Sequence, residues 1–253
     1  REEVVLKLEN LSVKNDRDLM AIKNVSLDIH AGEILGIAGV AGNGQKELAE
    51  AVAGLRKVVG GTITIHGEDV TTQGAKARVK KRVGFIPEDR LSMGLVPGMN
   101  MEENRILKEF DLPKFSRHHI LKKKVIHDTV QEEIKRYDIK TAGDKSPVSL
   151  MSGGNQQKLL VAREIGGDPV LLIAVYPSRG LDIGAAEAIH EILLEQCRKG
   201  VAVLLISEEL DELFQMSDRI GVLCSGEMMA VIDRKEADYD TIGRLMSGEH
   251  YEK

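Results

Sequence analysis

A glycine-rich segment, Gly39 to Glu47, follows a short apolar run and precedes an amphipathic helical pattern. Glycines at Gly39, Gly42 and Gly44, with Asn43 between them, let backbone N–H groups curl around an anion. The start of the following helix also favours negative charge. The segment therefore predicts a weakened phosphate site, while a turn that needs glycine only for tightness remains an equal alternative.

The polar residues after Gly44 depart from the phosphate-loop pattern of Gly, four residues, Gly, Lys and then Ser or Thr. Gln45 stands at the Lys position and cannot supply the cation that bridges two phosphates. Lys46 has no hydroxyl for Mg²⁺, and Glu47 adds negative charge. Each lost charge-assisted hydrogen bond is worth about 1.5–3 kcal/mol. We therefore expect weak nucleotide binding and poor hydrolysis at this loop.

A second candidate anion site begins at Ser152 and continues through Gly153 and Gly154 into a helical stretch. The serine offers a hydroxyl, the two glycines offer unhindered N–H donors, and the helix start adds a positive dipole end. Asn155 and Gln156 follow directly. An ordinary serine cap, without any ligand, is the alternative interpretation.

Two kinds of strand pattern position these segments. Alternating apolar and polar residues, typical of half-solvated antiparallel strands, occur at Val4 to Leu8, Asn24 to Ile29 and Thr62 to His66. Wholly apolar runs, typical of strands in a covered parallel sheet, occur at Ile34 to Ala38, Val170 to Val175 and Val201 to Ile206. Helical patterns at Leu48 to Leu55 and Ile183 to Arg198 complete an α/β alternation.

The middle of the chain, from about Met93 to Ala162, is polar and helical with no clear strand, and it predicts a helical insertion. We therefore expect a core with an antiparallel β-subdomain in residues 1–92 and 164–253, and a helical subdomain in 93–163. Seven basic or imidazole side chains gather in this insertion: Lys114, Arg117, His118, His119, Lys122, Lys123 and Lys124. A solvated face is their usual meaning, and proximity to anionic lipid or membrane subunits is the functional alternative.

The composition narrows the classes of protein. A net charge of −5 argues against a nucleic-acid protein, while 42% hydrophobic and 30% charged residues indicate a folded core. No apolar run reaches the roughly 18 residues of a membrane span. The charged start, Arg1 to Glu3, is not typical of a signal peptide, and Cys197 and Cys224 lack zinc-like spacing. We expect a cytoplasmic protein without a metal site of its own.

Three motifs in order give the sequence a resemblance over nearly its whole length. Met151 to Asn155 is similar to the signature LSGGQ, Pro177 to Asp182 to the D-loop, and Pro87 to Arg90 to the Q-loop, with Glu88 at the Gln position. The chain resembles a nucleotide-binding domain of the ATP-binding cassette (ABC) transporters. The residues of these motifs are most similar to those of the second cassette of tandem-cassette importers for simple sugars and nucleosides. The resemblance implies a P-loop NTPase-like fold with a parallel core sheet, an antiparallel β-subdomain and a helical insertion.

The same resemblance shows which positions depart from the family. Val175 stands where the family has its metal-binding Asp, Tyr176 where it has its catalytic Glu, and Glu208 where it has its switch His. Valine cannot hold Mg²⁺, and a phenol cannot act as a general base at neutral pH. Loss of such a base typically costs about 10²–10⁴ in rate. We therefore expect that this chain contributes no catalytic residue and holds no metal ion of its own.

Family cassettes pair head to tail, which implies a division of labour. The segment Ser152 to Gln156 would be donated to an ATP, with its Mg²⁺, that is held by a competent partner cassette, and Gly180, Leu181 and Asp182 would contact that partner. The implied partners are the N-terminal half of the same polypeptide, transmembrane permease subunits that dock on Glu88 to Asn104 and, indirectly, an extracytoplasmic substrate-binding protein. The implied location is the cytoplasmic face of the cell membrane.

Two alternatives remain open. A self-sufficient homodimeric ABC ATPase could use non-consensus residues, with Lys46 reaching the phosphates and Glu208 acting as base. A solvated Lys46 is the simpler expectation, because it lies one position late on the helix start. The other alternative is a regulatory cassette that kept the fold and lost nucleotide binding.

Overall fold

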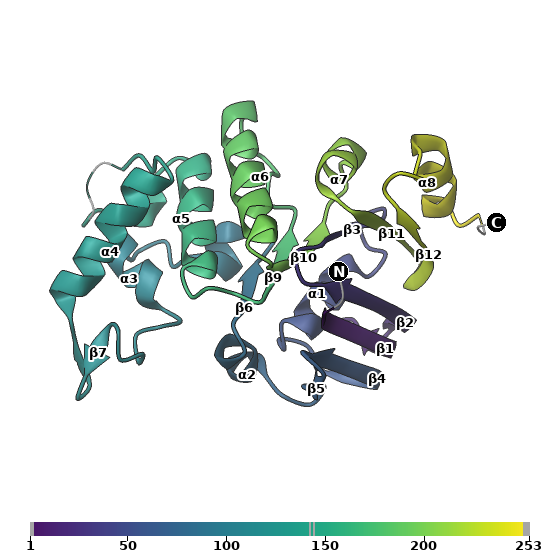
Figure 1. Ribbon diagram of the computed structural model, residues 1–253, viewed down its shortest axis with the longest axis horizontal. Helices are drawn as coiled ribbons and strands as arrows, with labels where there is room; N and C mark the ends of the chain where they lie inside the picture. The colour runs from purple at the N-terminus through teal and green to yellow at the C-terminus, as the bar shows by residue number, and fades with distance from the viewer. Residues whose placement is uncertain (1–2, 142, 144, 250–253) are drawn as a thin grey trace. The chain divides into compact units, whose positions relative to one another are not determined.

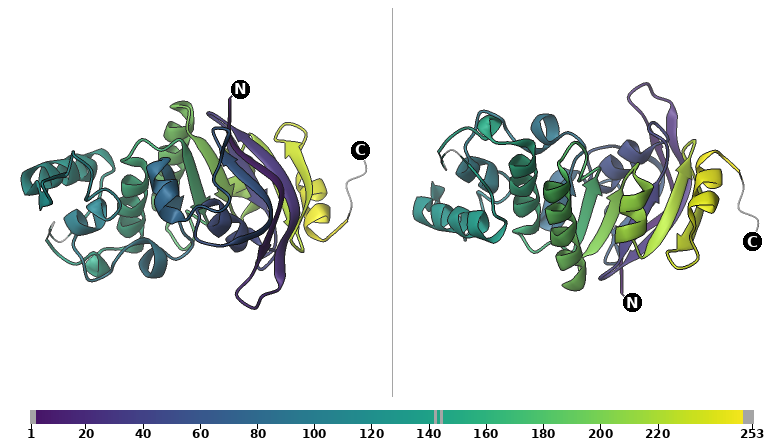
Figure 2. Two further views of the ribbon diagram at one scale, coloured as in Figure 1. Left: turned by 90° about the horizontal axis from the view of Figure 1, so that it is seen from below. Right: turned by 90° about the horizontal axis from the view of Figure 1, so that it is seen from above.

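The computed structural model describes residues 3–141, 143 and 145–249 (Figures 1 and 2). The chain divides into two compact units. The first contains the described residues of 3–85, 169–176 and 193–249, and the second those of 86–168 and 177–192. The chain passes between the units at four places, and the last, between residues 192 and 193, falls within the helical pattern that starts at Ile183. The domain boundaries expected at residues 92 and 163 stay a prediction.

A six-stranded sheet holds the apolar runs. Its order is β12-β11-β3-β10-β9-β6. The strands are β3 (Ile34–Ala38), β6 (Val83–Ile86), β9 (Leu171–Val175), β10 (Ala202–Ile206), β11 (Arg219–Cys224) and β12 (Glu227–Asp233). The pairs β11–β3, β3–β10 and β10–β9 are parallel, and β12 is antiparallel to β11. All residues of β3, β9 and β10 are buried, as expected for parallel strands covered on both faces.

The alternating segments form a second, antiparallel sheet of order β2-β1-β4-β5. Its strands are β1 (Val4–Lys14), β2 (Met20–His30), β4 (Val58–Ile65) and β5 (Glu68–Asp69). The strands β1, β2 and β4 extend beyond the predicted segments, and β1 pairs with both β2 and β4. The apolar side chains of this sheet join those of β3, β9 and β10 in one core. The fold is therefore the mixed α/β architecture with an antiparallel β-subdomain that the sequence predicts.

Four helices belong wholly to the first unit: α1 (Gln45–Val52), α2 (Ala75–Lys80), α7 (Leu210–Met216) and α8 (Tyr239–Met246). The helix α1 contacts strands of both sheets. The helix α7 packs closely on β3 at Gly36, where an added Cβ would lie 2.9 Å from the side chain of Leu213. The sequence pattern predicted α1 about three residues late, and it missed α2 and α7.

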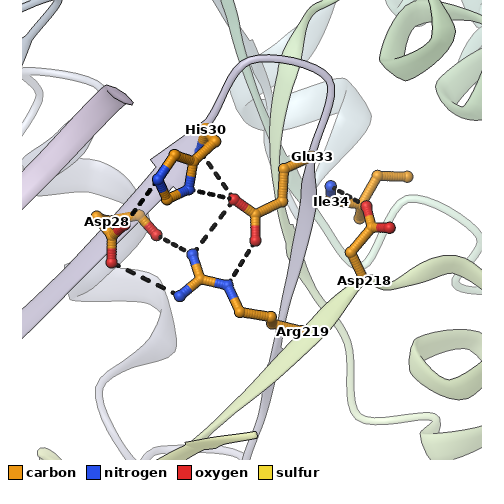
Figure 3. A network of polar contacts seen from close by, with 6 residues as sticks. All are labelled: Asp28, His30, Glu33, Ile34, Asp218 and Arg219. Carbon is orange, nitrogen blue, oxygen red and sulfur yellow. Dashed lines mark hydrogen bonds and ion pairs between the residues drawn. The ribbon is translucent and has the colours of Figure 1, made fainter. Parts of the chain in front are cut away.

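A polar network fixes the start of β3 (Figure 3). The carboxylate of Glu33, 1% exposed, accepts hydrogen bonds from Arg219 at 2.5 Å and from the backbone N–H of His30 at 2.8 Å. Burial by itself raises the pKa of Glu33, but these hydrogen bonds outweigh burial, so that its pKa lies below the ordinary value. The N–H of Ile34 donates to the carboxylate of Asp218 at 2.9 Å. The ends of β2, β3 and β11 are thereby joined.

The second unit is mainly helical. Its complete helices are α3 (Met101–Ile106), α4 (Lys123–Arg136) and α5 (Gly153–Ile165), and α6 (Ile183–Arg198) begins in it. A π-helical turn spans Arg90–Gly94, and a 3₁₀ turn spans Val148–Leu150.

The expectation of no strand in the insertion is wrong, because β7 (Ser116–Arg117) and β8 (Ile120–Leu121) form a hairpin. His118 and His119 both have positive φ angles, of 50° and 63°, and make its two-residue turn. In the part of the chain that the structure describes, no helix has the length and apolar character of a membrane span.

Candidate functional site

The glycine-rich loop lies at one edge of the core sheet, between β3 and α1. Gly44, the residue before α1, has a φ of 107°, and an added Cβ would lie 2.7 Å from the side chain of Ile22. Asn43 anchors the loop to the β11–β12 turn: its side-chain carbonyl accepts from the N–H of Ser225 at 2.9 Å and its backbone carbonyl from Gly226 at 3.1 Å. The loop thus has a fixed conformation that depends on glycine at Gly44.

Gln45 turns its side chain back into the loop. It is 2% exposed, and its Nε2 donates to the carbonyl of Val40 at 3.0 Å. A Cβ added at Gly39 would lie 2.5 Å from that nitrogen. Gly39 therefore leaves room for the amide of Gln45, and a donor of this amide is used by the backbone of the loop itself. The residue at the Lys position closes the loop and presents no cation.

Lys46 lies beside a cluster of charged side chains at the start of α1. Its ammonium is 3.8 Å from Glu50 and 4.0 Å from Asp16, and the lysine side chain is 50% exposed. Arg56 contacts both carboxylates, at 2.6 Å and 2.8 Å. The hydrogen bond and charge of Arg56, with a smaller contribution from Lys46, hold the pKa of Asp16 below its ordinary value. The charge of Lys46 is thus placed among carboxylates, and the first turn of α1 also contains Glu47.

The other positions of this site follow neighbouring strands of the parallel sheet. Val175 ends β9 and is 3% exposed. Tyr176 follows with a φ of 48°, and its N–H donates to the carbonyl of Ile206 at 2.8 Å. Glu208 is exposed just after β10. Carboxyl ends of parallel strands meet at one edge, where Gly39 also begins its loop.

The donor groups at this edge do not fit Mg²⁺. Val175 offers no oxygen from its side chain, and Gln45 and Lys46 offer no hydroxyl. Among the residues that the structure describes, no group of three or more His, Cys, Asp or Glu side chains could hold a metal ion. The loop keeps glycines with positive φ at Gly42 and Gly44, and the side chains of Gln45 and Val175 offer neither a cation nor a ligand for a metal.

The second predicted segment has a different geometry. Ser152 is the exposed N-cap of α5, and its Oγ accepts from the N–H of Asn155 at 3.5 Å and from the Nδ2 of the same residue at 2.8 Å. The Oδ1 of Asn155 accepts from the N–H of Lys140 at 2.8 Å, which fixes its orientation. Because both contacts of the Ser152 oxygen are accepted ones, the hydroxyl proton can be donated to a ligand. The segment therefore presents a free hydroxyl donor at the start of α5.

A guanidinium lies beside this cap, which the sequence did not predict. A Cβ added at Gly153 would lie 2.8 Å from an Nη of Arg90. Arg90 also donates to the carbonyl of Arg179 at 3.5 Å, and Arg179 makes an ion pair of 2.5 Å with Glu88. Arg90 thus adds a positive charge to the hydroxyl and N–H donors at the start of α5. Its sequence separation from Gly153 hides this proximity from any local pattern.

The segment Gly180 to Asp182 lies next to the cap in the same unit. The carboxylate of Asp182 accepts from the N–H of Ala185 at 2.9 Å and so begins α6. A Cβ added at Gly154 would lie 2.9 Å from the Cβ of Ala185, so glycine permits the close contact between α5 and the start of α6. Gln156 is buried and donates to two carbonyls of the preceding turn, which makes it a supporting residue.

The predicted residues therefore fall into two groups, each within one unit. The first unit carries the loop of residues 39–47 together with Val175, Tyr176 and Glu208. The second carries Glu88, residues 152–156 and residues 180–182.

Known proteins are similar to this chain over nearly its whole length. A family model described as "ABC transporter" matches residues 22–174. The nucleoside import ATP-binding protein NupA of Lactococcus lactis is 41% identical over 98% of this chain and 49% of its own length. The guanosine import ATP-binding protein NupO of Bacillus subtilis is 41% identical over 96% of this chain and 48% of its own length. The glucose import ATP-binding protein TsgD13 of Haloferax volcanii is 40% identical over 97% of this chain and 45% of its own. The chain spans about half the length of the curated relatives it matches.

Solved structures agree on the fold. A nucleotide-free ATP-binding cassette from an ABC transporter superposes with a TM-score of 0.79 at 19% identity, covering 96% of this chain and 95% of its own. A dimeric post-hydrolysis cassette bound to ADP and Pi gives a TM-score of 0.76 at 23% identity, covering 90% and 98%. The fold, the ordered motifs and the match over residues 22–174 lead to one conclusion: this chain belongs to the ABC transporter family.

Proposed function

We propose that this chain is the second nucleotide-binding cassette of an ATP-driven importer for nucleosides or simple sugars, and that it completes the ATP site of a competent partner cassette. The names of the relatives, which state nucleoside, guanosine and glucose import, support the transported class. One observation carries the assignment of roles. The Gln45 amide is used inside its own loop, while the hydroxyl of Ser152 is exposed and can donate its proton.

The donated groups are those at the start of α5. The hydroxyl of Ser152 and the N–H groups of Gly153 and Gly154 would bind the terminal phosphate of an ATP held by the partner's loop, and Arg90 would add positive charge nearby. Mg²⁺ and the attacking water belong to the partner site, where ATP hydrolysis supplies the driving force. The role of this chain is to bind and orient the phosphate, because charge-assisted donors fixed in place stabilise anionic transition states.

The loop of residues 39–47 would form the second, degenerate site of the pair. Its backbone can still contact phosphate, but without a cation or metal ligands this chain's own site contributes little or no hydrolysis. Residues Gly180, Leu181 and Asp182 would contact the partner cassette. Two large apolar side chains flank these motifs in the second unit and are strongly exposed, Leu150 at 70% and Ile183 at 80%. Such exposure is consistent with a protein surface that a partner covers.

The further partners follow from membership in an importer. Transmembrane permease subunits would dock on Glu88 to Asn104, where Met93 is 48% exposed and Val96 39% exposed. A substrate-binding protein outside the cell would act indirectly through the permease. The cassette would therefore work at the cytoplasmic face of the membrane.

The proposal is tested by placing a positively charged side chain at Ser152 and measuring ATP turnover. In the complete transporter, Ser152→Arg should lower ATP turnover by about 100-fold or more, because it replaces a phosphate donor with a bulky side chain. The control Ser247→Arg makes the same change at an exposed serine at the end of α8, where a cation is tolerated by the helix dipole. Normal turnover of the Ser152→Arg variant would refute the donor role.

Measurements on the chain alone separate the alternatives. Hydrolysis of ATP by the purified chain, lost on Glu208→Gln, would favour a self-sufficient homodimeric ATPase over the proposed role. Calorimetry with ATP addresses the regulatory alternative. A complete lack of binding, together with normal turnover of the Ser152→Arg transporter, would favour a nucleotide-independent cassette.

A further inference from the structure

The β7–β8 hairpin leads into the start of α4 in the second unit (Figure 1). These two elements, with the residues just before the hairpin, carry both cationic and apolar side chains. We call this surface the hairpin face. Its cations are Lys114, Arg117, Lys122, Lys123 and Lys124. Its exposed apolar residues are Phe110, Leu112, Ile120, Leu121 and Val125.

The hairpin face carries more basic than acidic residues. Between Phe110 and Val125 the sequence has five Lys and Arg residues and one acidic residue, Asp111. Within the described parts of the chain, Arg117, Lys123 and Lys124 have no ion-pair partner. Lys122 donates to a backbone carbonyl, which leaves its charge in place. The three lysines also lie at the start of α4, where the helix dipole disfavours cations. Stability of the helix therefore does not explain these charges.

The exposed apolar side chains of the hairpin face lie close in sequence to residues that are buried in the core of this unit. Ile120 is 73% exposed and Phe110 is 55% exposed. Phe115, just before the hairpin, is fully buried with Ile126, and the N–H of Lys122 donates to the carbonyl of Phe115 at 2.8 Å. The hairpin is thus anchored in the apolar core of this unit. Exposed apolar groups on such an anchored hairpin, surrounded by cations, indicate a surface for binding.

We propose that the hairpin face binds the surface of a bilayer that contains anionic phospholipids. The cations would contact lipid phosphates, and Ile120 and Leu121 would enter the boundary between headgroups and acyl chains. Charge complementarity supports this partner, because basic residues near an anionic bilayer each add to binding, and exposed apolar area adds an attraction that salt does not screen. This contact goes beyond the proposed function and does not depend on which cassette holds ATP.

The test measures binding of the full chain to vesicles by sedimentation. The wild type should bind vesicles of phosphatidylglycerol and phosphatidylcholine and should not bind pure phosphatidylcholine. The triple variant Arg117→Gln, Lys123→Gln and Lys124→Gln should lower the partition coefficient by about 100-fold, given the usual contribution of each basic residue.

The matched control removes the same number of charges from exposed lysines of the first unit, with Lys57→Gln, Lys76→Gln and Lys80→Gln. This control should bind as the wild type does. Equal loss in both triple variants would show a mere effect of net charge and overturn the proposal. All variants should keep the circular dichroism spectrum of the wild type, since none of the six side chains is buried.

A second variant tests the apolar part of the hairpin face. Ile120→Ser with Leu121→Ser should weaken vesicle binding mainly at high salt, where electrostatic attraction is screened. Inorganic phosphate at millimolar concentration should not displace the wild type from vesicles; displacement would indicate a site for free phosphate. Binding of the wild type to permease in phosphatidylcholine vesicles, with no binding to anionic vesicles, would indicate an acidic protein partner. Either result would refute the lipid contact.

Discussion

Two segments of this chain, residues 39–47 and residues 152–156, each combine glycines with a polar residue at the start of a helix. They differ in where that polar side chain points. In the loop of residues 39–47 the polar residue after the last glycine is Gln45. Its side chain turns inward and donates a hydrogen bond to the carbonyl of Val40. At the start of α5 the polar side chain comes before the glycines, and Ser152 is exposed. Glycine near a helix start therefore does not by itself identify a working anion site. A polar side chain beside the glycines can donate to a ligand only if its donor groups are not already used within the protein.

Charge separates the two segments further. Lys46 is placed near Glu50 and Asp16, so its positive charge is shared with two carboxylates. The cap at Ser152 has Arg90 beside Gly153, and the contact of Arg90 with the Arg179 carbonyl leaves its charge in place. In the first segment the Gln45 amide is used by the loop itself, and at the second a hydroxyl donor and a guanidinium lie together. Each prediction below tests one part of this contrast.

The largest expected effect concerns the glycines of the loop. Gly44→Ala should lower the free energy of unfolding by about 3–4 kcal/mol, because a Cβ there is strained at positive φ and also meets neighbouring atoms. Gly42→Ala is the control: its φ is also positive, at 87°, but an added Cβ meets nothing within 4 Å. It should cost only about 1–2 kcal/mol. Urea unfolding measures both, and equal losses would show that packing at Gly44 is unimportant.

The next effect concerns the support of β3, which leads into the loop. Glu33→Gln should lower the free energy of unfolding at pH 7 by about 2 kcal/mol, since it removes a charged acceptor from Arg219. The pKa of Glu33 is depressed in the folded chain, so its stabilisation is present above the ordinary value of 4.5 and is lost as the pH falls through the lower folded value. The wild type should therefore lose stability in acid more steeply than the variant. The exposed Glu227→Gln should leave the pH profile unchanged.

A repaired loop should bind nucleotide better. The double variant Gln45→Lys and Lys46→Ser restores the cation and the hydroxyl of the phosphate-loop pattern. It should raise the ATP affinity of the chain about tenfold in calorimetry, because one charge-assisted hydrogen bond is regained. Hydrolysis should remain absent while Val175 and Tyr176 stay in place. Lys46→Ser alone, which supplies no cation, should not raise affinity; if it did, Lys46 itself would be what limits binding.

The smallest expected effect is on stability at the cap. Ser152→Ala removes an acceptor from the start of α5 and should lower the free energy of unfolding by about 1 kcal/mol in thermal denaturation. Ser152→Thr keeps a hydroxyl and should cost less. The contrast lies in turnover of the complete transporter, where the alanine variant should lose far more than its stability accounts for. A loss of several kcal/mol in stability would instead make Ser152 a structural residue.

The sequence predicted the bounds of those elements whose residues show a clear hydrophobic pattern. The buried strand Ile34–Ala38 and the helix Ile183–Arg198 have the predicted bounds, because continuous apolar residues and a 3.6-residue period are direct signals. The β7–β8 hairpin was missed because two-residue strands are too short for any alternation. Its paired histidines at positive φ are an unusual choice for a turn that favours Asn and Gly.

The candidate site divides in the same way. The serine cap of α5 follows from adjacent residues and was predicted as an alternative to ligand binding. The position of Arg90 beside Gly153 and the bond between Asn43 and Ser225 join residues far apart in the chain, so no spacing rule could reveal them. The inward turn of Gln45 was also invisible, because a glutamine side chain has several rotamers and only the folded loop selects one.

The order of the core sheet has a consequence for synthesis of the protein on the ribosome. The neighbours of Ile34–Ala38 are Ala202–Ile206 and Arg219–Cys224, which are made much later. A nascent chain that ends at residue 150 would hold this apolar strand with both edges open, a state prone to wrong pairing. The glycine-rich loop can take its final form only after the turn that contains Ser225 has emerged. Pairing of both edges of this strand therefore waits until residues 219–224 have been made.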